Sequence, residues 1–277
     1  MNAQSNSSTK TATKPRHYLM TRPTHYTVAY EINPWMHPEI ATDTARALAQ
    51  WQELHDIYVE LGHRVDVIDD APGLPDMVYA ANGGLVVGGK AIAANFTYPQ
   101  RQPETPLYNA WFEQAGFPVF STRGRSEGEG DILTVGSTIL AGTGFRTALS
   151  AHVEIAEITG LEVVSLELVD SRYYHLDTAL SVLSPELIAY YPPAFSAASR
   201  AVLEARFPDA VIAEDEDAAA LGLNLVSDGT HAVMAPQARR LGDAVRERGF
   251  EVITVNTDEL LKGGGGIKCC TLEIRAA

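Results

Sequence analysis

The stretch ALSAHVEIAEITGLEVV, residues 148–164, contains the pattern that decides the fold. Its first part carries apolar residues at the three- and four-residue spacing of an amphipathic helix. Gly160 follows as the usual C-terminal stop of such a helix, and the β-branched Val163 and Val164 then favour a strand. The stretch therefore predicts a helix that ends at a glycine and leads directly into a buried strand.

The same order of helix, break and strand occurs five times along the chain. The expected helices cover 42–61, 106–115, 148–159, 196–207 and 236–248. Strand hairpins are expected at 84–87 with 91–94, at 132–135 with 138–140, and at 179–183 with 188–190. Such repetition predicts an α/β protein in which residues 16–277 form a single catalytic domain, a five-bladed α/β propeller with pseudo-five-fold ββαβ-type repeats. A doubly wound α/β sheet is the alternative.

Composition excludes several classes of function. The formal net charge of −14 disfavours nucleic acid and anionic membranes as partners, and no run approaches the roughly 18 apolar residues of a membrane span. The only cysteines, Cys269 and Cys270, are adjacent, so a disulfide framework is excluded and the reducing cytoplasm is the expected compartment. Residues 1–15, rich in Asn, Ser, Thr and Lys, are expected to form a disordered tail.

Polar residues gather in the loops that follow the repeated units. These loops are LPDMVYAANGG at 74–84, SEGEGDIL at 126–133, YYHLDTAL at 173–180, GLNLVSDG at 222–229 and GGGGIKCCTLEI at 263–274. If the units surround an axis, equivalent loops converge. Convergence would bring a thiol, an imidazole and several carboxylates into one site, as nucleophilic catalysis requires.

Strand alternation distinguishes the two cysteines. Along the expected strand, Cys270 shares the apolar face with Leu272 and Ile274, whereas Cys269 shares the polar face with Thr271 and Glu273. Cys269 is therefore the candidate nucleophile and Cys270 the packing residue, although most buried cysteines are inert. No CxxC or HxxxH spacing supports a zinc site, so no metal is expected.

Two further pairs of residues have a chemical rationale. His175 and Asp177 would lie on one side of a strand, where an acid–base imidazole sits beside a carboxylate that suits a cation. Arg101 follows ANFTYPQ and Arg146 lies within GTGFRTA, where either could bind a substrate carboxylate. The alternatives are a structural histidine and ordinary surface arginines.

Taken together, GGGGIKCCT, HLDT and EGEGD resemble motifs of the guanidino-group-modifying superfamily, over residues 17 to 275. That superfamily has the pentein fold and includes amidinotransferases, arginine deiminase, dimethylargininase, agmatine deiminase and arginine dihydrolase. The resemblance implies attack on the guanidinium carbon of a small arginine-like substrate, without metal or organic cofactor. It leaves a homo-oligomer open.

The resemblance also implies roles for individual residues. Cys269 resembles the nucleophile, His175 the acid–base group, and Asp177 its guanidinium-binding partner. Glu127 resembles the active glutamate, with Glu129 as a rival because one extra residue precedes the substrate-binding Asp131. The remaining substrate-binding candidates are Arg101 and Arg146, similar to the carboxylate clamp, together with Asn82 and Asn33.

One departure points to the substrate. The segments YEINPWM, which contains Asn33, and DMVYAANGGLV are similar to arginine dihydrolases, and Asn82 stands where deiminases and dimethylargininases usually place a carboxylate. Asparagine both donates and accepts hydrogen bonds, so it can also hold the neutral ureido group of citrulline. Arginine dihydrolase is therefore the expected activity. Dimethylargininase is the alternative, followed by arginine deiminase, an amidinotransferase, or a non-catalytic binding module of the same fold.

Overall fold

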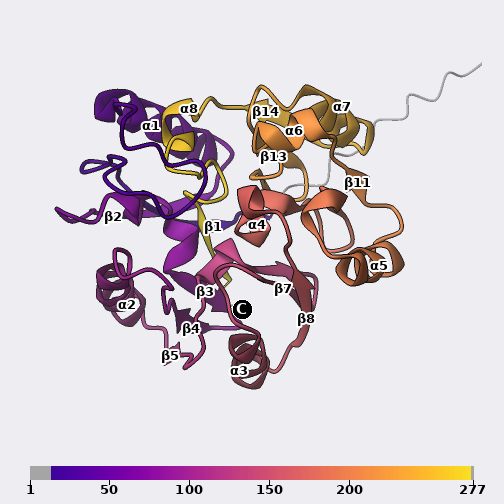
Figure 1. Ribbon diagram of the computed structural model, residues 1–277, viewed down its shortest axis with the longest axis horizontal. Coiled ribbons are helices and arrows are strands. Elements are labelled where there is room, and N and C mark those ends of the chain that lie inside the picture. Colours follow the sequence, from indigo (N-terminus) through magenta and orange to yellow (C-terminus); the bar gives the residue numbers. More distant parts are fainter. Residues whose placement is uncertain (1–13, 276–277) are drawn as a thin grey trace, which may run out of the picture.

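The computed structural model describes residues 14–275 (Figure 1). Most of the expected tail, residues 1–13, lies outside the described residues, and Lys14 and Pro15 are exposed. Among residues 14–275, no helix combines the length and the apolar character needed to cross a membrane.

All five predicted helices are present, with ends within three residues of those expected. They are α1 (Thr44–Glu60), α2 (Thr105–Gln114), α3 (Leu149–Thr159), α5 (Ala197–Arg206) and α7 (Arg239–Glu247). Local chemistry explains their limits: the Asp43 side chain accepts a hydrogen bond from Arg46 N at the start of α1, and Gly160 ends α3 with a φ of 74°. Three shorter helices were not predicted: α4 (Leu176–Ala179), α6 (Asp215–Ala219) and α8 (Asp258–Leu261).

The described strands form five antiparallel pairs, each extended by one parallel strand. The groups are β15 (Leu272–Arg275), β1 (His17–Thr21) and β2 (Arg64–Ile68); β3 (Gly84–Val87), β4 (Lys90–Ala93) and β5 (Val119–Ser121); β6 (Ile132–Val135), β7 (Thr138–Thr143) and β8 (Glu162–Glu167); β9 (Leu180–Val182), β10 (Ile188–Tyr190) and β11 (Val211–Ile212); and β12 (Val226–Ser227), β13 (His231–Met234) and β14 (Glu251–Thr254). The three predicted hairpins are confirmed as β3–β4, β6–β7 and β9–β10.

In every group a long helix connects the two parallel strands. Figure 1 shows these helices around the periphery and the strands inside them. The pairing of β1 with β15 joins the two ends of the described chain, and β15 also pairs with β3, so two groups merge into one six-stranded sheet.

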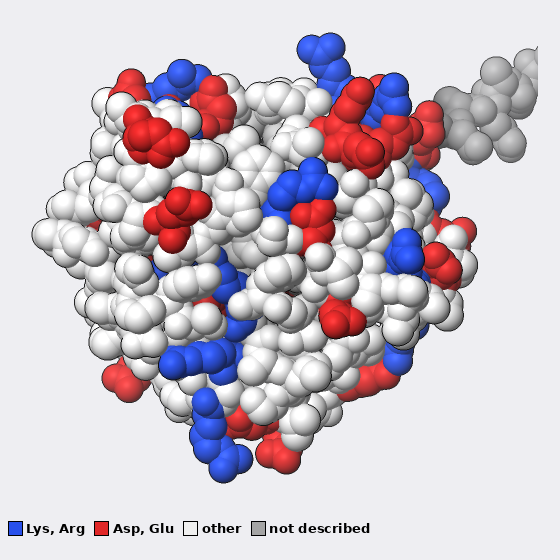
Figure 2. Space-filling model, in the orientation of Figure 1, with Lys and Arg blue, Asp and Glu red and all other residues white. Residues whose placement is uncertain are grey.

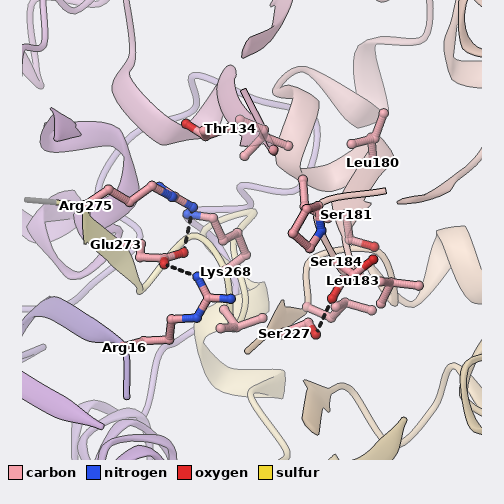
Figure 3. A pocket seen from close by; sticks show the side chains of 16 residues that line it. Arg16, Thr134, Leu180, Ser181, Leu183, Ser184, Ser227, Lys268, Glu273 and Arg275 are labelled. Atoms are coloured by element: carbon pink, nitrogen blue, oxygen red, sulfur yellow. Dashed lines mark hydrogen bonds and ion pairs between the residues drawn. The ribbon is translucent and has the colours of Figure 1, made fainter. Parts of the chain in front are cut away.

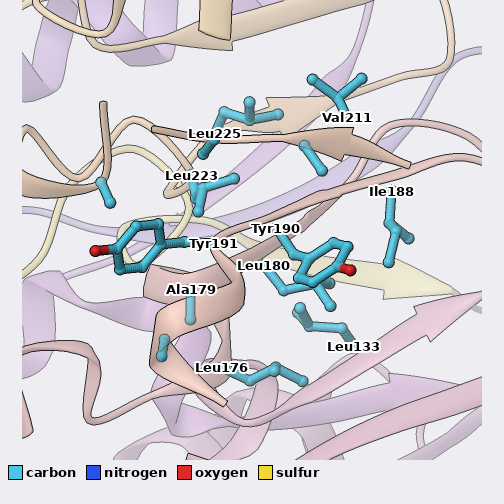
Figure 4. Packing of buried hydrophobic residues seen from close by; sticks show 14 of the residues in the cluster. Leu133, Leu176, Ala179, Leu180, Ile188, Tyr190, Tyr191, Val211, Leu223 and Leu225 are labelled. Atoms are coloured by element: carbon cyan, nitrogen blue, oxygen red, sulfur yellow. The ribbon is translucent and has the colours of Figure 1, made fainter. Parts of the chain in front are cut away.

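Apolar side chains fill the spaces between the helices and the sheets. One cluster combines Leu176 and Leu180 with Tyr190 and Leu223, drawn from four separate segments (Figure 4). Burial of this apolar surface is the main source of stability for such a fold. On the surface, acidic side chains gather near α6, whose first turn is acidic (Figure 2).

Candidate active site

A buried glutamate holds the candidate acid–base histidine. His175 Nε2 donates to Glu127 Oε2 at 2.7 Å, and Arg146 Nη1 donates to the same oxygen at 3.0 Å. Burial by itself would raise the pKa of Glu127, but the Arg146 cation and the His175 contact outweigh it and hold that pKa well below its usual range. Glu127 is therefore an ionised anchor. Because it occupies Nε2 of His175, Nδ1 is the nitrogen that can exchange a proton with a substrate.

Asp131 positions the segment that carries His175. Its Oδ1 accepts a hydrogen bond from Leu176 N at 3.0 Å, at the start of α4. Burial raises the pKa of Asp131 to about 6, and its Oδ2 has no partner among the described side chains and backbone groups. Asp131 thus contacts the backbone next to His175, and its expected role as a direct substrate ligand stays a prediction.

The candidate nucleophile lies between a carboxyl and an amide. Cys269 Sγ is 3.2 Å from Asp177 Oδ2, and Asn224 Nδ2 donates to Sγ at 3.1 Å. Asn224 Oδ1 accepts from Cys269 N at 3.1 Å and from Gly266 N at 3.2 Å, so one side chain fixes the whole turn. Burial raises the pKa of the Cys269 thiol, and the neighbouring Asp177 raises it further.

The expected strand positions of Cys269 and of the pair His175 and Asp177 were wrong. Cys269 lies in a turn before β15, not on a strand, and it is as buried as Cys270, so alternation does not separate the two thiols. Their contacts separate them instead, since Cys269 meets Asp177 and Asn224. Similarly, His175 precedes the short helix α4 and Asp177 lies inside it. A short apolar run does not distinguish one helical turn from a strand.

Asn82 presents only its amide nitrogen to the interior. Arg101 Nη1 donates to Asn82 Oδ1 at 2.7 Å, whereas Asn82 Nδ2 is buried without a hydrogen-bond partner in the described chain. A Cβ added at Gly130 would lie 2.2 Å from that nitrogen and 3.2 Å from the His175 ring. The glycine therefore allows Asn82 and His175 to approach the same small space.

Arg101, one of the two arginines expected in the carboxylate clamp, donates mainly to acceptors of the protein itself. Its guanidinium pairs with both oxygens of Glu104 at 2.8 Å and also donates to Asp76 O at 3.1 Å. Asn82 Oδ1 is the fourth acceptor atom, so Arg101 is a buried support of the loop 74–84. Four of its five N–H groups therefore have protein acceptors and one N–H on Nη1 is left, so its expected place in a carboxylate clamp stays a prediction.

Arg146 and Asn33 line the same surface hollow, and their expected role in binding the substrate stays a prediction. Arg146 stacks between the rings of Tyr98 and Tyr174, at 4.5 and 4.6 Å, and lines a surface hollow together with Asn33. Asn33 Nδ2 donates to Gly263 O at 3.0 Å and to Tyr174 Oη at 3.3 Å. These hydrogen bonds connect the hollow to the glycine-rich turn.

The contacts of Glu127 and Glu129 show which of the two carboxylates lies against His175. Glu129 turns away from His175 and accepts from Lys268 Nζ at 2.8 Å, with Arg275 as a second cationic partner. Those two cations lower the pKa of Glu129 although burial opposes them. Glu127 is thus the carboxylate that contacts the histidine.

Asn224 and Asp76 lie in the polar loops 222–229 and 74–84 but were not predicted to be site residues. Asn224 contacts the thiol directly, and Asp76 accepts from Tyr30 Oη at 2.9 Å while its Oδ1 stays buried without a partner among the residues described. Asp177 Oδ1 is likewise unpartnered within residues 14–275. Unpaired carboxylate oxygens are suited to the N–H groups of a guanidinium, and Asp177 carries one of them beside the Cys269 thiol. Within residues 14–275, no three or more His, Cys, Asp or Glu side chains form a group that could hold a metal ion.

Comparison with known proteins agrees with this chemistry. Residues 34–276 match the family described as N,N dimethylarginine dimethylhydrolase, eukaryotic. The chain is 51% identical to an N(G),N(G)-dimethylarginine dimethylaminohydrolase of Mycobacterium tuberculosis, over 94% of this chain and 86% of that protein. It is 42% identical to the bifunctional arginine dihydrolase/ornithine cyclodeaminase ArgZ of Synechocystis, over 92% of this chain but only 37% of ArgZ.

Solved structures extend the likeness to three dimensions. The substrate-bound N-terminal domain of ArgZ, a cyanobacterial arginine dihydrolase, matches with a TM-score of 0.90 and 40% identity, over 94% of this chain and 98% of that domain. A dimethylarginine dimethylaminohydrolase adduct with S-methyl-L-thiocitrulline, at 19% identity and a TM-score of 0.82, shares the mixed α/β fold over 94% of this chain and all of that chain. The family match and the relatives together show that this chain belongs to the N,N-dimethylarginine dimethylhydrolase family.

Proposed function

We propose that this chain is an arginine dihydrolase, which converts L-arginine and two waters to ornithine, carbon dioxide and two ammonia molecules. Membership of the family makes the chain a hydrolase of carbon–nitrogen bonds in amidines. The substrate and the number of hydrolyses are the proposed part. They rest on the orientation of a single amide, that of Asn82.

Arg101 determines that orientation. Since Arg101 Nη1 donates to Asn82 at 2.7 Å, the contacted atom is the amide oxygen, and the inward-facing atom is the donor Nδ2. A guanidinium offers only N–H donors and cannot satisfy Nδ2. The ureido carbonyl of citrulline, the product of a first hydrolysis, accepts a hydrogen bond and can. An inward-facing donor therefore favours a site that binds citrulline for a second hydrolysis.

The proposed chemistry uses three residues. The Cys269 thiolate forms a bond to the guanidinium carbon, and His175 Nδ1 protonates the departing amine, which leaves as ammonia. His175 then accepts a proton from water, whose oxygen attacks the same carbon as the carbon–sulfur bond breaks, releasing citrulline. In the second round ammonia leaves the ureido carbon, and water releases carbamate, which breaks down to carbon dioxide and ornithine. Glu127 keeps the imidazole oriented throughout.

The substrate itself assists ionisation of the thiol. In the free protein, burial and the adjacent Asp177 raise the pKa of Cys269, so the thiol is protonated at neutral pH. A guanidinium bound to Asp177 Oδ1 and Asp76 Oδ1 places a cation beside the sulfur. That cation offsets the negative charge of the carboxylates and favours the thiolate.

Dimethylarginine is the second candidate substrate, and the 51% identity to the mycobacterial dimethylaminohydrolase favours it. The same residues would then expel dimethylamine and stop at citrulline. The two candidates differ at Asn82, because a single hydrolysis has no use for a donor aimed at a ureido carbonyl.

The architecture of the domain completes the proposal. Residues 16–277 would form one catalytic domain, in which the strand groups are the blades of a closed five-bladed pentein propeller with the site on its axis. The repeated pairing of an antiparallel hairpin with a parallel third strand supports this arrangement. Two free cysteines suit a reducing compartment, so we place the protein in the cytoplasm.

Product identification tests the function. Arginine labelled with ¹³C at the guanidinium carbon should yield labelled carbon dioxide and unlabelled ornithine, and added citrulline should also be converted to ornithine. Formation of citrulline and dimethylamine from dimethylarginine, without ornithine from arginine or citrulline, would replace dihydrolase with dimethylargininase. His175→Ala should form none of these products.

A further inference from the structure

A cavity of about 200 Å³ is lined by Lys268, the residue next to Cys269, and by none of the candidate active-site residues (Figure 3). It is formed where the first strands of four groups, β15, β6, β9 and β12, come together with the residue that precedes β1. Its volume is below the roughly 300–1,000 Å³ of pockets for drug-sized ligands. The cavity therefore suits a short molecule.

One wall of this cavity is cationic. Arg16, Lys268 and Arg275 line it, with Glu273 between the two arginines (Figure 3). Glu273 accepts from Arg16 Nη1 at 3.1 Å and from Arg275 Nη2 at 2.6 Å, and the buried Glu129 pairs with Lys268. Three cations against two carboxylates leave one positive charge, which is distinctive in a chain of net charge −14.

Donors on the cavity walls remain unpaired. Arg16 Nε, Ser181 Oγ and Thr134 Oγ1 are buried atoms without hydrogen-bond partners in the part of the chain that is described, and all three residues line the cavity. Ser181 is only 3% exposed. Lys268 Nζ donates to Glu129 and to Thr271 O, which leaves one of its three N–H groups free. Because a buried donor without a partner is costly, this set indicates an acceptor-rich ligand.

The opposite wall is apolar around its serines. Leu180 and Leu183 stand across from Glu273 and Arg16 in Figure 3, but both are fully buried in the core. The apolar surface of this wall comes from the half-buried Val182 and the exposed Pro185. An inorganic anion would leave that wall without a partner. A molecule with an anionic head and an apolar body would use both walls.

We propose that this cavity binds a small monocarboxylate with a short apolar body. The carboxylate accepts from Arg16 Nε and the free Lys268 N–H, the hydroxyls of Ser181 and Thr134 supply further donors, and the apolar body packs against Val182 and Pro185. This site is separate from the arginine site: Lys268 faces the cavity, whereas the next residue, Cys269, faces Asp177 and Asn224.

Calorimetric titration of the full chain with hexanoate tests the site. Hexanoate should bind saturably, and hexanamide should bind about tenfold or more weakly, because hydrogen bonds to a charged acceptor are roughly twice as strong as neutral ones. Inorganic phosphate should not bind comparably. Failure of hexanoate to bind, or equal binding of hexanamide or phosphate, would overturn the proposal.

Two variants locate the binding. Arg16→Met should weaken hexanoate binding about tenfold or more, and Ser181→Leu should abolish it by filling the cavity, so either folded variant is decisive. The matched control is Arg123→Met, since Arg123 is 94% exposed and lies outside the cavity. Unchanged binding in either folded cavity variant contradicts the site.

Competition separates this site from the arginine site. Hexanoate affinity should be unchanged by arginine in the Cys269→Ser protein, whereas displacement by arginine would place hexanoate at Arg146 and overturn the proposal. None of these binding measurements depends on turnover, so their outcome is independent of whether the chain is a dihydrolase.

Discussion

Arg101 donates a hydrogen bond from Nη1 to Asn82 Oδ1 at 2.7 Å, and this contact determines which atom of the Asn82 amide faces the site. Arg101 is held in turn by both oxygens of Glu104. A buried arginine with four of its five N–H groups hydrogen-bonded thus determines which atom of a neighbouring amide faces the reacting groups. An amide whose two ends are otherwise interchangeable acquires a single orientation.

Replacement of Asn82 by aspartate should separate the two hydrolyses. In Asn82→Asp one carboxylate oxygen keeps the contact with Arg101, and the other replaces Nδ2 and faces the substrate. That oxygen repels a ureido carbonyl but accepts from a guanidinium, so citrulline should accumulate. A mispaired buried polar group costs about 1–3 kcal/mol, or roughly a 10- to 100-fold loss in the second step. Chromatography of the products measures the ratio of citrulline to ornithine, and an unchanged ratio would remove Asn82 from substrate selection.

The two thiols should respond differently to serine. Cys269→Ser should abolish turnover with the fold retained, because Cys269 Sγ is the sulfur beside Asp177 and Asn224. Cys270→Ser should keep substantial activity but lower the melting temperature, because a hydroxyl replaces a fully buried thiol in an apolar cluster. Rate assays and thermal melts on both variants check this. Activity retained in Cys269→Ser and lost in Cys270→Ser would reverse the assignment.

Arg146→Ala should impair both binding and turnover. Loss of the carboxylate contact should raise KM for arginine far more than KM for agmatine, which lacks the carboxylate. Because Arg146 Nη1 also pairs with Glu127 Oε2 at 3.0 Å, kcat should fall for both substrates. Arg146→Lys should restore part of the KM effect but less of kcat, since lysine lacks the planar donor pair. Equal changes in KM for the two substrates would place the clamp elsewhere.

Asp177→Asn should stabilise the protein at high pH. Burial raises the pKa of Asp177 to about 7, against an unfolded value of about 3.9, so the folded state binds the proton more tightly. The contribution of Asp177 to stability is then fully present below about pH 4 and is lost as the pH rises to about 7. Asparagine removes this loss. The melting temperature of Asp177→Asn should therefore exceed that of the wild type at pH 8, with little difference at pH 4, and an equal shift at both pH values would contradict the titration of Asp177.

Several local features were predictable from sequence because short-range physics determines them. The helix 148–159 and its stop at Gly160 appear as α3, since apolar spacing and a left-handed glycine act within a few residues. Short elements were less predictable. The segment after His175 forms one helical turn because Asp131, far away in sequence, accepts the hydrogen bond of Leu176 N. Periodicity within so few residues does not distinguish a turn of helix from a strand.

The sequence by itself determined the order of helices and strands, the polar loops, and the residue types that suit attack on a guanidinium. Only the tertiary structure decided which members of those loops meet. It placed Glu127 on His175 and Glu129 on Lys268, although the two glutamates are two residues apart. It also tied Arg101 to Asn82 and Glu104, and brought Asn224 to the thiol. Such choices depend on side-chain directions set by long-range strand pairing and packing, and residue spacing along the chain does not contain that information.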